Sequence, residues 1–395
     1  MARSQPRTGR PAPVLQVLLV ALALSLLPAL QTAKAQPQTT PARAAFLIDL
    51  SSGAVLLEKD ADTPLPPASM SKLMTLEIVF DALRNGRLKL EDNFRTSARA
   101  AAMGGSKMFI RSGEVVSIQD LLRGVIVQSG NDAAVALAEA ISGTEESFAQ
   151  LMNQRAGQLG LANSNFVNST GWPAAGHEMS LRDLAILAER LVDDYPDYYP
   201  IFAETSFTWD GITQSNRNPL LDLDIGADGL KTGHTEEAGY GLVASAERDG
   251  RRVVLVIAGL DSNQARSQEA ERLINWAFRA FETRRLLEKG QTVATAKVWI
   301  GDKDSVGLAT ADELVVTVPV GSLEQAQMRA HFNEPVAAPV EAGAELGRLE
   351  VTIPDVTPVS VPLVAVELVE RGGVGARFGA AARLLMRRLL EGVAG

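Results

Sequence analysis

Ser69 and Lys72 stand three residues apart at the start of a helical pattern. Residues at this spacing lie on the same face of a helix, one turn from each other. A serine hydroxyl is a weak nucleophile that needs a base, and with no histidine in the motif a lysine of lowered pKa could accept its proton. The start of a helix also favours negative charge that develops near Ser69. Taken alone, the same pattern describes a helix-capping serine and a surface lysine.

Two further motifs place polar residues in unusual surroundings. Residues 129–131, Ser-Gly-Asn, interrupt an apolar run, where polar side chains are either buried and paired or line a cleft. Residues 231–233, Lys-Thr-Gly, lie in a predicted edge strand, where a glycine marks a close approach to the backbone. Their lysine and threonine could bind a carboxylate. The alternative interpretations are a helix cap or break for the first motif and a charged, aggregation-resistant edge for the second.

In this order, the three motifs resemble those of the serine penicillin-recognising enzymes, which carry S-x-x-K, S-x-N and K-T-G around one cleft. The closer resemblance is to the D-alanyl-D-alanine carboxypeptidases, the low-molecular-mass penicillin-binding proteins. It covers nearly all of residues 40–285, and the C-terminal segments are similar to this subgroup too. The matching segments are residues 67–75, 128–133, 177–183, 216–218, 228–235 and 238–240.

The resemblance implies covalent catalysis on Ser69. This serine attacks the carbonyl between the two D-alanines of a peptidoglycan pentapeptide stem and forms an acyl-enzyme, while Lys72 accepts its proton. Ser129 relays a proton to the leaving D-alanine, with Lys231 as a second participant, and water then releases the shortened peptide. A β-lactam copies the D-Ala-D-Ala end, acylates the same serine and leaves slowly.

The resemblance also implies which residues bind the substrate. Asn131 positions the peptide, and Lys231 and Thr232 hold its terminal carboxylate. The strand continues through Gly233 to His234, whose backbone N–H forms the oxyanion hole together with that of the nucleophile. His177 and Asp183 are expected to hold a loop rather than to take part in the chemistry.

Three other functions compete with a carboxypeptidase. A class A β-lactamase places E-x-x-L-N after the second motif, but no acid between Asp132 and Asp183 has this context, and Gly130 stands where those enzymes have aspartate. A D,D-endopeptidase that cuts cross-links would use the same machinery, and the motifs do not separate it from a carboxypeptidase. A cell-wall-binding or scaffold protein with an inactive site is disfavoured, because a decayed site is expected to have lost a motif residue.

The composition excludes several other kinds of chemistry. The chain has 395 residues, 46% of them hydrophobic and 22% charged, which suits a globular protein of two or three domains. A formal net charge of −9 disfavours nucleic acid as a partner. The absence of cysteine excludes disulfides, thiolate metal sites and a cysteine nucleophile. The 3 histidines lie far apart without an HExxH motif, so no metal or cofactor is predicted.

A sheet and helices must position the motifs. Two strands around a turn at residues 51–53 begin the main body, and an apolar strand over 252–259 with a helix over 268–281 ends it. Between them, apolar residues recur at helical spacing, for example over 121–137. The pattern predicts one sheet with edges from distant parts of the chain. The resemblance implies a serine β-lactamase/transpeptidase-like α/β (α+β) fold with an antiparallel sheet covered by helices.

The N-terminus has the pattern of a secretory signal. Arg3, Arg7 and Arg10 precede an apolar run over residues 17–27, and residues 33–35, Ala-Lys-Ala, form an A-x-A cleavage site. An uncleaved membrane anchor is the alternative, although the apolar run is shorter than the roughly 20 residues that a span needs. In both cases the body of the protein is exported, which predicts a periplasmic location.

The C-terminal part predicts a small all-β domain and a membrane-associating helix. Short β-rich runs separated by Gly, Pro and Asp turns fill residues 292–370. Over residues 373–395, apolar side chains and arginines fall on opposite arcs of a helix, as in helices that lie on anionic membranes. A terminal helix packed on its own domain is the alternative. The sequence predicts no oligomeric state.

The chain is thus predicted to consist of a signal peptide over 1–35, a linker over 36–43, a penicillin-binding peptidase domain over 44–285, the β domain over 292–370 and the amphipathic helix over 373–395. Through this last helix the protein is predicted to lie peripherally on the inner membrane.

Overall fold

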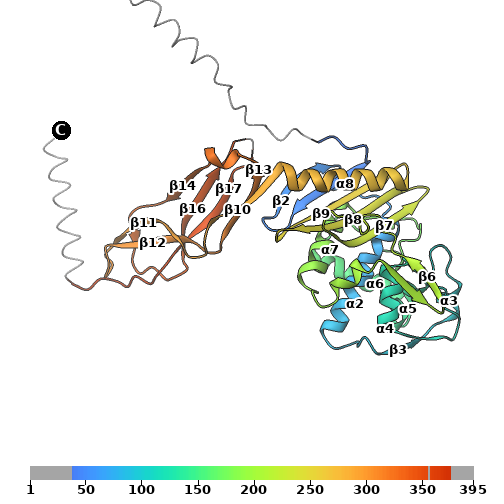
Figure 1. Ribbon diagram of the computed structural model, residues 1–395. Coiled ribbons are helices and arrows are strands. Elements are labelled where there is room, and N and C mark those ends of the chain that lie inside the picture. Colours follow the sequence, from blue (N-terminus) through green and yellow to red (C-terminus); the bar gives the residue numbers. More distant parts are fainter. Residues whose placement is uncertain (1–37, 355, 375–395) are drawn as a thin grey trace, which may run out of the picture. The chain divides into compact units, whose positions relative to one another are not determined.

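The structure is a computed structural model that describes residues 38–354 and 356–374. Its first part is built around a five-stranded antiparallel sheet in the order β2-β1-β9-β8-β7 (Figure 1). Because β1 pairs with β9, the sheet joins distant parts of the chain, as predicted. The strands are β1 (Ala44–Asp49), β2 (Ala54–Lys59), β7 (Ala227–Thr235), β8 (Gly239–Arg248) and β9 (Arg251–Leu260).

Helices cover both faces of this sheet (Figure 1). Alternate side chains of a strand point to opposite faces, so Leu255 of β9 packs with α8 (Asn263–Ala280), whereas Val256 belongs to the larger apolar cluster on the other face. That cluster includes buried residues of α2 (Lys72–Arg84) and α7 (Leu181–Asp193). The predicted antiparallel sheet covered by helices is therefore confirmed.

The remaining helices of this part lie between β2 and β7 in the sequence. Helices α4, α6 and α7 each begin after a Ser or Thr whose side-chain oxygen accepts a backbone N–H bond, which satisfies a free donor at the helix start. The apolar stretch predicted as helical over 121–137 forms two helices with a break at residues 127–130. The elements are η1 (Ala68–Ser71), α3 (Ala98–Ala102), α4 (Ile118–Ile126), α5 (Asn131–Ser142), α6 (Glu145–Leu159), η2 (Tyr199–Ala203), and the hairpins β3 (Asn93–Arg95) with β4 (Val115–Ser117) and β5 (Ser206–Trp209) with β6 (Ile212–Ser215).

The part after α8 is β-rich, as predicted. Strands β10 (Phe281–Leu287) and β13 (Leu314–Pro319) pair, and a six-stranded sheet has the order β14-β16-β17-β12-β11-β15. Apolar side chains of both sheets form a cluster of their own. The remaining elements are β11 (Thr292–Trp299), β12 (Ser305–Thr310), η3 (Ser322–Gln325), β14 (Gln327–Phe332), β15 (Val336–Ala337), β16 (Glu345–Thr352) and β17 (Val359–Ala365).

The predicted signal peptide lies outside the described residues, as does the predicted C-terminal helix apart from residues 373 and 374. In the predicted linker, Gln38 and Thr39 accept hydrogen bonds from Arg272 of α8. None of the helices within residues 38–354 and 356–374 combines the length and hydropathy that a membrane span requires.

Candidate active site

Ser69 lies in the short helix η1, and Lys72 is the first residue of α2. Lys72 Nζ lies 2.9 Å from Ser69 Oγ, which is within hydrogen-bond reach. The lysine is fully buried, because α2 packs against helices α5, α6 and α7. The structure therefore brings together the serine and the lysine that the first motif predicts as nucleophile and base.

The partners of Lys72 leave one direction open for a lone pair. Its Nζ donates to Asn131 Oδ1 and to the Thr170 carbonyl, each at 2.7 Å. The amide nitrogen of Asn131 donates to the Gly104 carbonyl at 2.7 Å, which turns Oδ1 toward the lysine. A neutral amine has two N–H donors and one lone pair, and both of these oxygens can only accept. The third contact, to Ser69 Oγ, is therefore the one that can receive a proton from the hydroxyl.

Burial lowers the pKa of Lys72 to about 7, against the opposing effect of the Asp132 carboxylate. Asp132 is itself fully buried at the start of α5 and accepts backbone N–H bonds from residues 108–110 and from Ala133. These bonds satisfy the carboxylate and hold the 104–110 segment beside the site. Near neutral pH a substantial fraction of Lys72 is the neutral amine that general-base catalysis needs.

Ser129 lies in the break between α4 and α5, with a backbone φ of 59°. This left-handed conformation is costly for a residue with a side chain and persists only where the surroundings impose it. The next two residues are fixed by N–H bonds of Gly130 to Gly124 and of Asn131 to Ser106, both at 2.8 Å. The turn places Ser129 on the wall of the same cavity as Ser69.

Strand β7 carries the third motif along the edge of the sheet. A Cβ atom at Gly233 would lie 2.9 Å from the Pro67 carbonyl oxygen and 3.2 Å from Ala68 Cβ. Any side chain there would push the nucleophile segment away from the strand. The close approach predicted for this glycine is thus the approach of η1, which brings Ser69 and Thr232 to one cavity of ≈ 400 Å³.

Basic side chains lie in and near the wall of this cavity. Lys231 is fully buried. Its burial is the main cause that holds its pKa well below the ordinary value, and the charges of Lys72, Arg266 and Arg217 act in the same direction. Arg217 and Arg266 line the cavity together with His234, whose ring stacks on Tyr240 with centroids 3.9 Å apart. The site therefore favours an anion, such as a peptide carboxylate, near Lys231 and Thr232.

Arg266 is a cavity residue that sequence reasoning missed. It lies on the buried face of α8, and burial lowers its pKa to about 10. Within the described part of the chain its Nε has no hydrogen-bond partner. The sequence does indicate a buried position for this arginine. It falls in an apolar helical stripe with Ala270, Leu273 and Ala277.

His177 and Asp183 hold loops, as predicted. The N–H of Val167 donates to His177 Nδ1 at 3.1 Å, so the ring proton is on Nε2, which lies 2.8 Å from Ser71 Oγ. Burial lowers the pKa of His177 to about 4, so the ring is neutral at neutral pH. Asp183 Oδ2 accepts bonds from the backbone N–H of residue 163 and the hydroxyl of Ser164.

No carboxylate is among the described residues that line the cavity around Ser69. A class A β-lactamase deacylates with the help of a glutamate at this place. Glu145 is instead bonded to Ser169 and Arg99, outside the cavity lining. The structure thus disfavours the β-lactamase alternative.

A serine–lysine pair, an S-x-N turn and a K-T-G edge strand around one cavity are the arrangement of the serine penicillin-recognising enzymes. A family model described as D-alanyl-D-alanine carboxypeptidase matches residues 31–262, and one described as penicillin-binding protein 5, C-terminal domain, matches residues 281–371. The chain belongs to the D-alanyl-D-alanine carboxypeptidase family of serine hydrolases. The family resemblance and the fold class predicted from the motifs are both confirmed.

Individual relatives agree with this assignment. D-alanyl-D-alanine carboxypeptidase DacC of Escherichia coli (strain K12) is 40% identical over 340 residues, covering 84% of this chain and 85% of that protein. The crystal structure of penicillin binding protein 5 from Haemophilus influenzae is 36% identical, with a TM-score of 0.80, and covers 85% of this chain and 99% of that one. Penicillin-binding protein D2 from Listeria monocytogenes, solved in an ampicillin-bound form, is 30% identical with a TM-score of 0.56, over 61% of this chain and 98% of that one.

Proposed function

We propose that the protein removes the terminal D-alanine from peptidoglycan pentapeptide stems through an acyl-enzyme on Ser69. The observation that carries this proposal is the environment of Lys72, whose two acceptor-only partners leave its lone pair for the Ser69 hydroxyl. β-Lactams acylate the same serine in this proposal, in keeping with the ampicillin-bound relative.

The reaction begins when Lys72 takes the proton of Ser69 and Oγ attacks the carbonyl carbon between the two D-alanines. The backbone N–H groups of Ser69 and His234 stabilise the oxyanion. Collapse of the intermediate breaks the C–N bond, and the Ser129 hydroxyl passes the proton from the Lys72 ammonium to the departing amine. Water then attacks the ester carbonyl and gives a proton to Lys72, and Lys72 passes this proton to Ser69 Oγ as the ester C–O bond breaks and the shortened peptide leaves.

Substrate binding follows from the charges of the cavity. The terminal carboxylate binds at Thr232, which lines the cavity next to the buried Lys231, and Arg217 and Arg266 add positive charge. Asn131 Nδ2 and Oδ1 are engaged with Gly104 and Lys72, so Asn131 orders both the base and the cavity wall that positions the peptide. The rest of the stem peptide extends from the nucleophile into a neighbouring hollow of ≈ 460 Å³. Ala68 of the nucleophile segment and Trp172 line this hollow.

The rate of acylation should depend on pH through Lys72. Protonation removes its lone pair, so the second-order rate constant with benzylpenicillin should fall as the pH drops below about 7, the pKa of the buried amine. The measurement is this rate constant from pH 5 to 9, with thermal melting to verify that the protein stays folded. The same fall of the rate constant at low pH in a His234→Gln protein would exclude the His234 imidazole as the group responsible. A rate constant that stays unchanged from pH 9 down to pH 5 would contradict the assignment of Lys72 as the base.

The reaction itself is tested with two substrates. The purified protein is expected to release D-alanine from a soluble peptide ending in D-Ala-D-Ala, and a Ser69→Ala protein is expected not to. Cleavage of cross-linked muropeptides without D-alanine release would move the assignment to an endopeptidase. Inactivity on both substrates would favour a scaffold protein that retains a penicillin-binding fold.

We further propose that the protein is exported by residues 1–35 and lies in the periplasm, peripheral on the inner membrane through residues 373–395. The support is the sequence pattern of both ends. The separate apolar clusters support the division into a peptidase domain over 44–285 and a β domain over 292–370.

Deletion of residues 377–395 should release the mature protein from membranes, because it removes most of the basic amphipathic pattern. The measurement is sedimentation with vesicles that contain anionic lipids, with D-alanine release assayed in parallel. The truncated protein should remain in the supernatant with unchanged activity. Sedimentation of the truncated protein to the same extent as the full chain would refute the anchor.

A further inference from the structure

One of the two acceptors that orient Lys72 is the carbonyl of Thr170, and this residue lies in a loop rather than in a helix or strand. The loop packs directly on the nucleophile segment, since a Cβ atom at Gly171 would lie 1.8 Å from the Ala68 carbonyl oxygen. A loop carbonyl has no helix or sheet ladder to fix its direction. The direction of the Lys72 lone pair therefore depends on the contacts that hold this loop.

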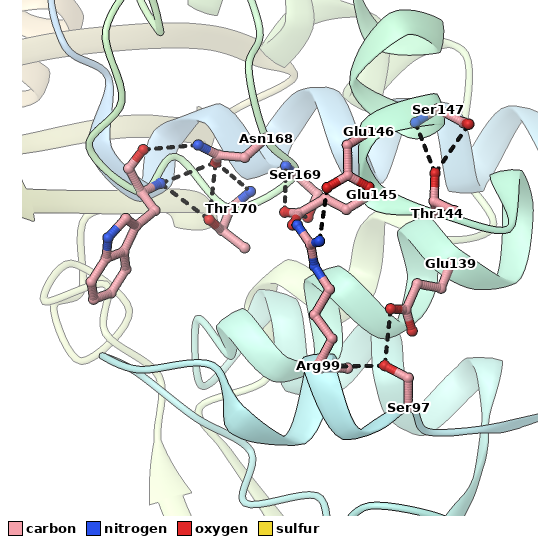
Figure 2. A network of polar contacts seen from close by, with 12 residues as sticks. Ser97, Arg99, Glu139, Thr144, Glu145, Glu146, Ser147, Asn168, Ser169 and Thr170 are labelled. Carbon is pink, nitrogen blue, oxygen red and sulfur yellow. Dashed lines mark hydrogen bonds and ion pairs between the residues drawn. The ribbon is translucent and has the colours of Figure 1, made fainter.

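Asn168 ties the loop to itself. Its Oδ1 accepts bonds from the backbone N–H and the hydroxyl of Thr170, at 3.1 and 3.0 Å, and from the N–H groups of Gly171 and Trp172, at 2.9 and 3.1 Å (Figure 2). These bonds set the shape of residues 168–172, but all of them are internal to the loop. They do not fix its position relative to Lys72.

Glu145 fixes that position. This first residue of α6 is 6% exposed in its side chain, and its Oε1 accepts the N–H of Ser169 at 3.1 Å and the Ser169 hydroxyl at 2.8 Å (Figure 2). Its other oxygen pairs with Arg99 at 2.8 Å. On the opposite side, Thr75, on the same helix as Lys72, donates to the Ser169 carbonyl at 2.7 Å. Ser169 is thus held between α6 and α2, and the next carbonyl in the chain, that of Thr170, is one of the two acceptors of Lys72.

We propose that Glu145 is a positioning residue for the reaction, which fixes Ser169 and thereby the Thr170 carbonyl that directs Lys72 toward Ser69. This inference rests on the proposed function, because it assigns Lys72 as the base. Glu145 does not line the cavity, so it has no contact with substrate. The chain supplies a matched control in Glu146, which pairs with the same Arg99 at 2.7 Å but is 64% exposed and has no bond to the loop.

The experiment compares Glu145→Ala, Glu145→Gln and Glu146→Ala in acylation by benzylpenicillin and in steady-state D-alanine release. Loss of the carboxylate lets the loop shift, and misplacement of a catalytic group by about 1 Å can cost 100-fold, so Glu145→Ala should lower kcat and the acylation rate by about 10- to 100-fold with little change in KM. Glutamine keeps an oxygen that can accept both Ser169 bonds, so Glu145→Gln should restore most of the rate. Glu146→Ala should match the wild type.

Two results would overturn the inference. One is a Glu145→Ala protein as active as the wild type. The other is a loss that glutamine does not restore and that appears in KM as much as in kcat. If Glu145→Ala fails to fold, Thr75→Val removes the other anchor of Ser169, and unchanged acylation by that variant would equally refute the role of the loop. If the wild type releases no D-alanine, the proposed function fails instead, so the two failures are distinguishable.

Discussion

Replacement of Lys72 by methionine should lower the acylation of Ser69 by about 1,000-fold, because general-base catalysis contributes about 100- to 10,000-fold. Methionine has a similar length and suits the fully buried position, but it has no lone pair for the Ser69 hydroxyl. The measurement is the second-order rate constant with benzylpenicillin at pH 8, where the wild-type lysine is mostly neutral.

Stability must be followed in the same proteins. The substitution leaves Asn131 Oδ1 and the Thr170 carbonyl without their donor, which lowers the free energy of unfolding by about 1–3 kcal/mol for each. It also removes a buried amine, whose burial is itself unfavourable, so the two effects oppose each other. Lys89→Met is a suitable control, since this lysine is exposed and distant in sequence from the motifs. Acylation of the Lys72→Met protein within tenfold of the wild type would show that another group accepts the serine proton.

Replacement of Lys231 by methionine should lower kcat/KM for a peptide that ends in D-Ala-D-Ala by about 100-fold, since hydrogen bonds to charged groups contribute about 1.5–3 kcal/mol. The loss is limited because Arg217 and Arg266 still supply positive charge to the cavity. The measurement is kcat/KM for the free-acid peptide and for the same peptide ending in D-alaninamide.

The pair of peptides separates carboxylate binding from general damage. The wild type should prefer the free acid strongly, and the Lys231→Met protein should lose most of this preference, because it lacks the buried amine next to Thr232. An equal loss on both peptides would contradict carboxylate recognition by Lys231. It would favour instead the transfer of a proton to the leaving group.

Much of the site could be predicted from sequence because its side chains come in short motifs. The spacing of Ser69 and Lys72 on one helical turn survives in the structure with the two polar atoms 2.9 Å apart. Gly233 was identified as a point of close approach because glycine in a strand has few other uses. Strands β1 and β9 were found because both are buried on their two faces and therefore have continuous apolar sequences.

Other features have weak sequence signals for physical reasons. Strand β14 is largely exposed and strand β12 contains glycine, so neither shows the alternation that marks a half-buried strand. A helix break was one of the interpretations that residues 129–131 allowed, but the left-handed conformation of Ser129 has no sequence signal, because neighbouring segments impose it on a residue that is not glycine. The backbone acceptor at Thr170 is invisible in a sequence, since every residue carries a carbonyl.

The central claim is that Ser69 is the nucleophile, and the most direct test is mass spectrometry of the protein after reaction with benzylpenicillin. We expect one covalent adduct per chain, located after digestion on the peptide that contains Ser69, and no adduct in a Ser69→Ala protein that melts at the same temperature as the wild type. An adduct on another residue, or equal labelling of the Ser69→Ala protein, would contradict the account.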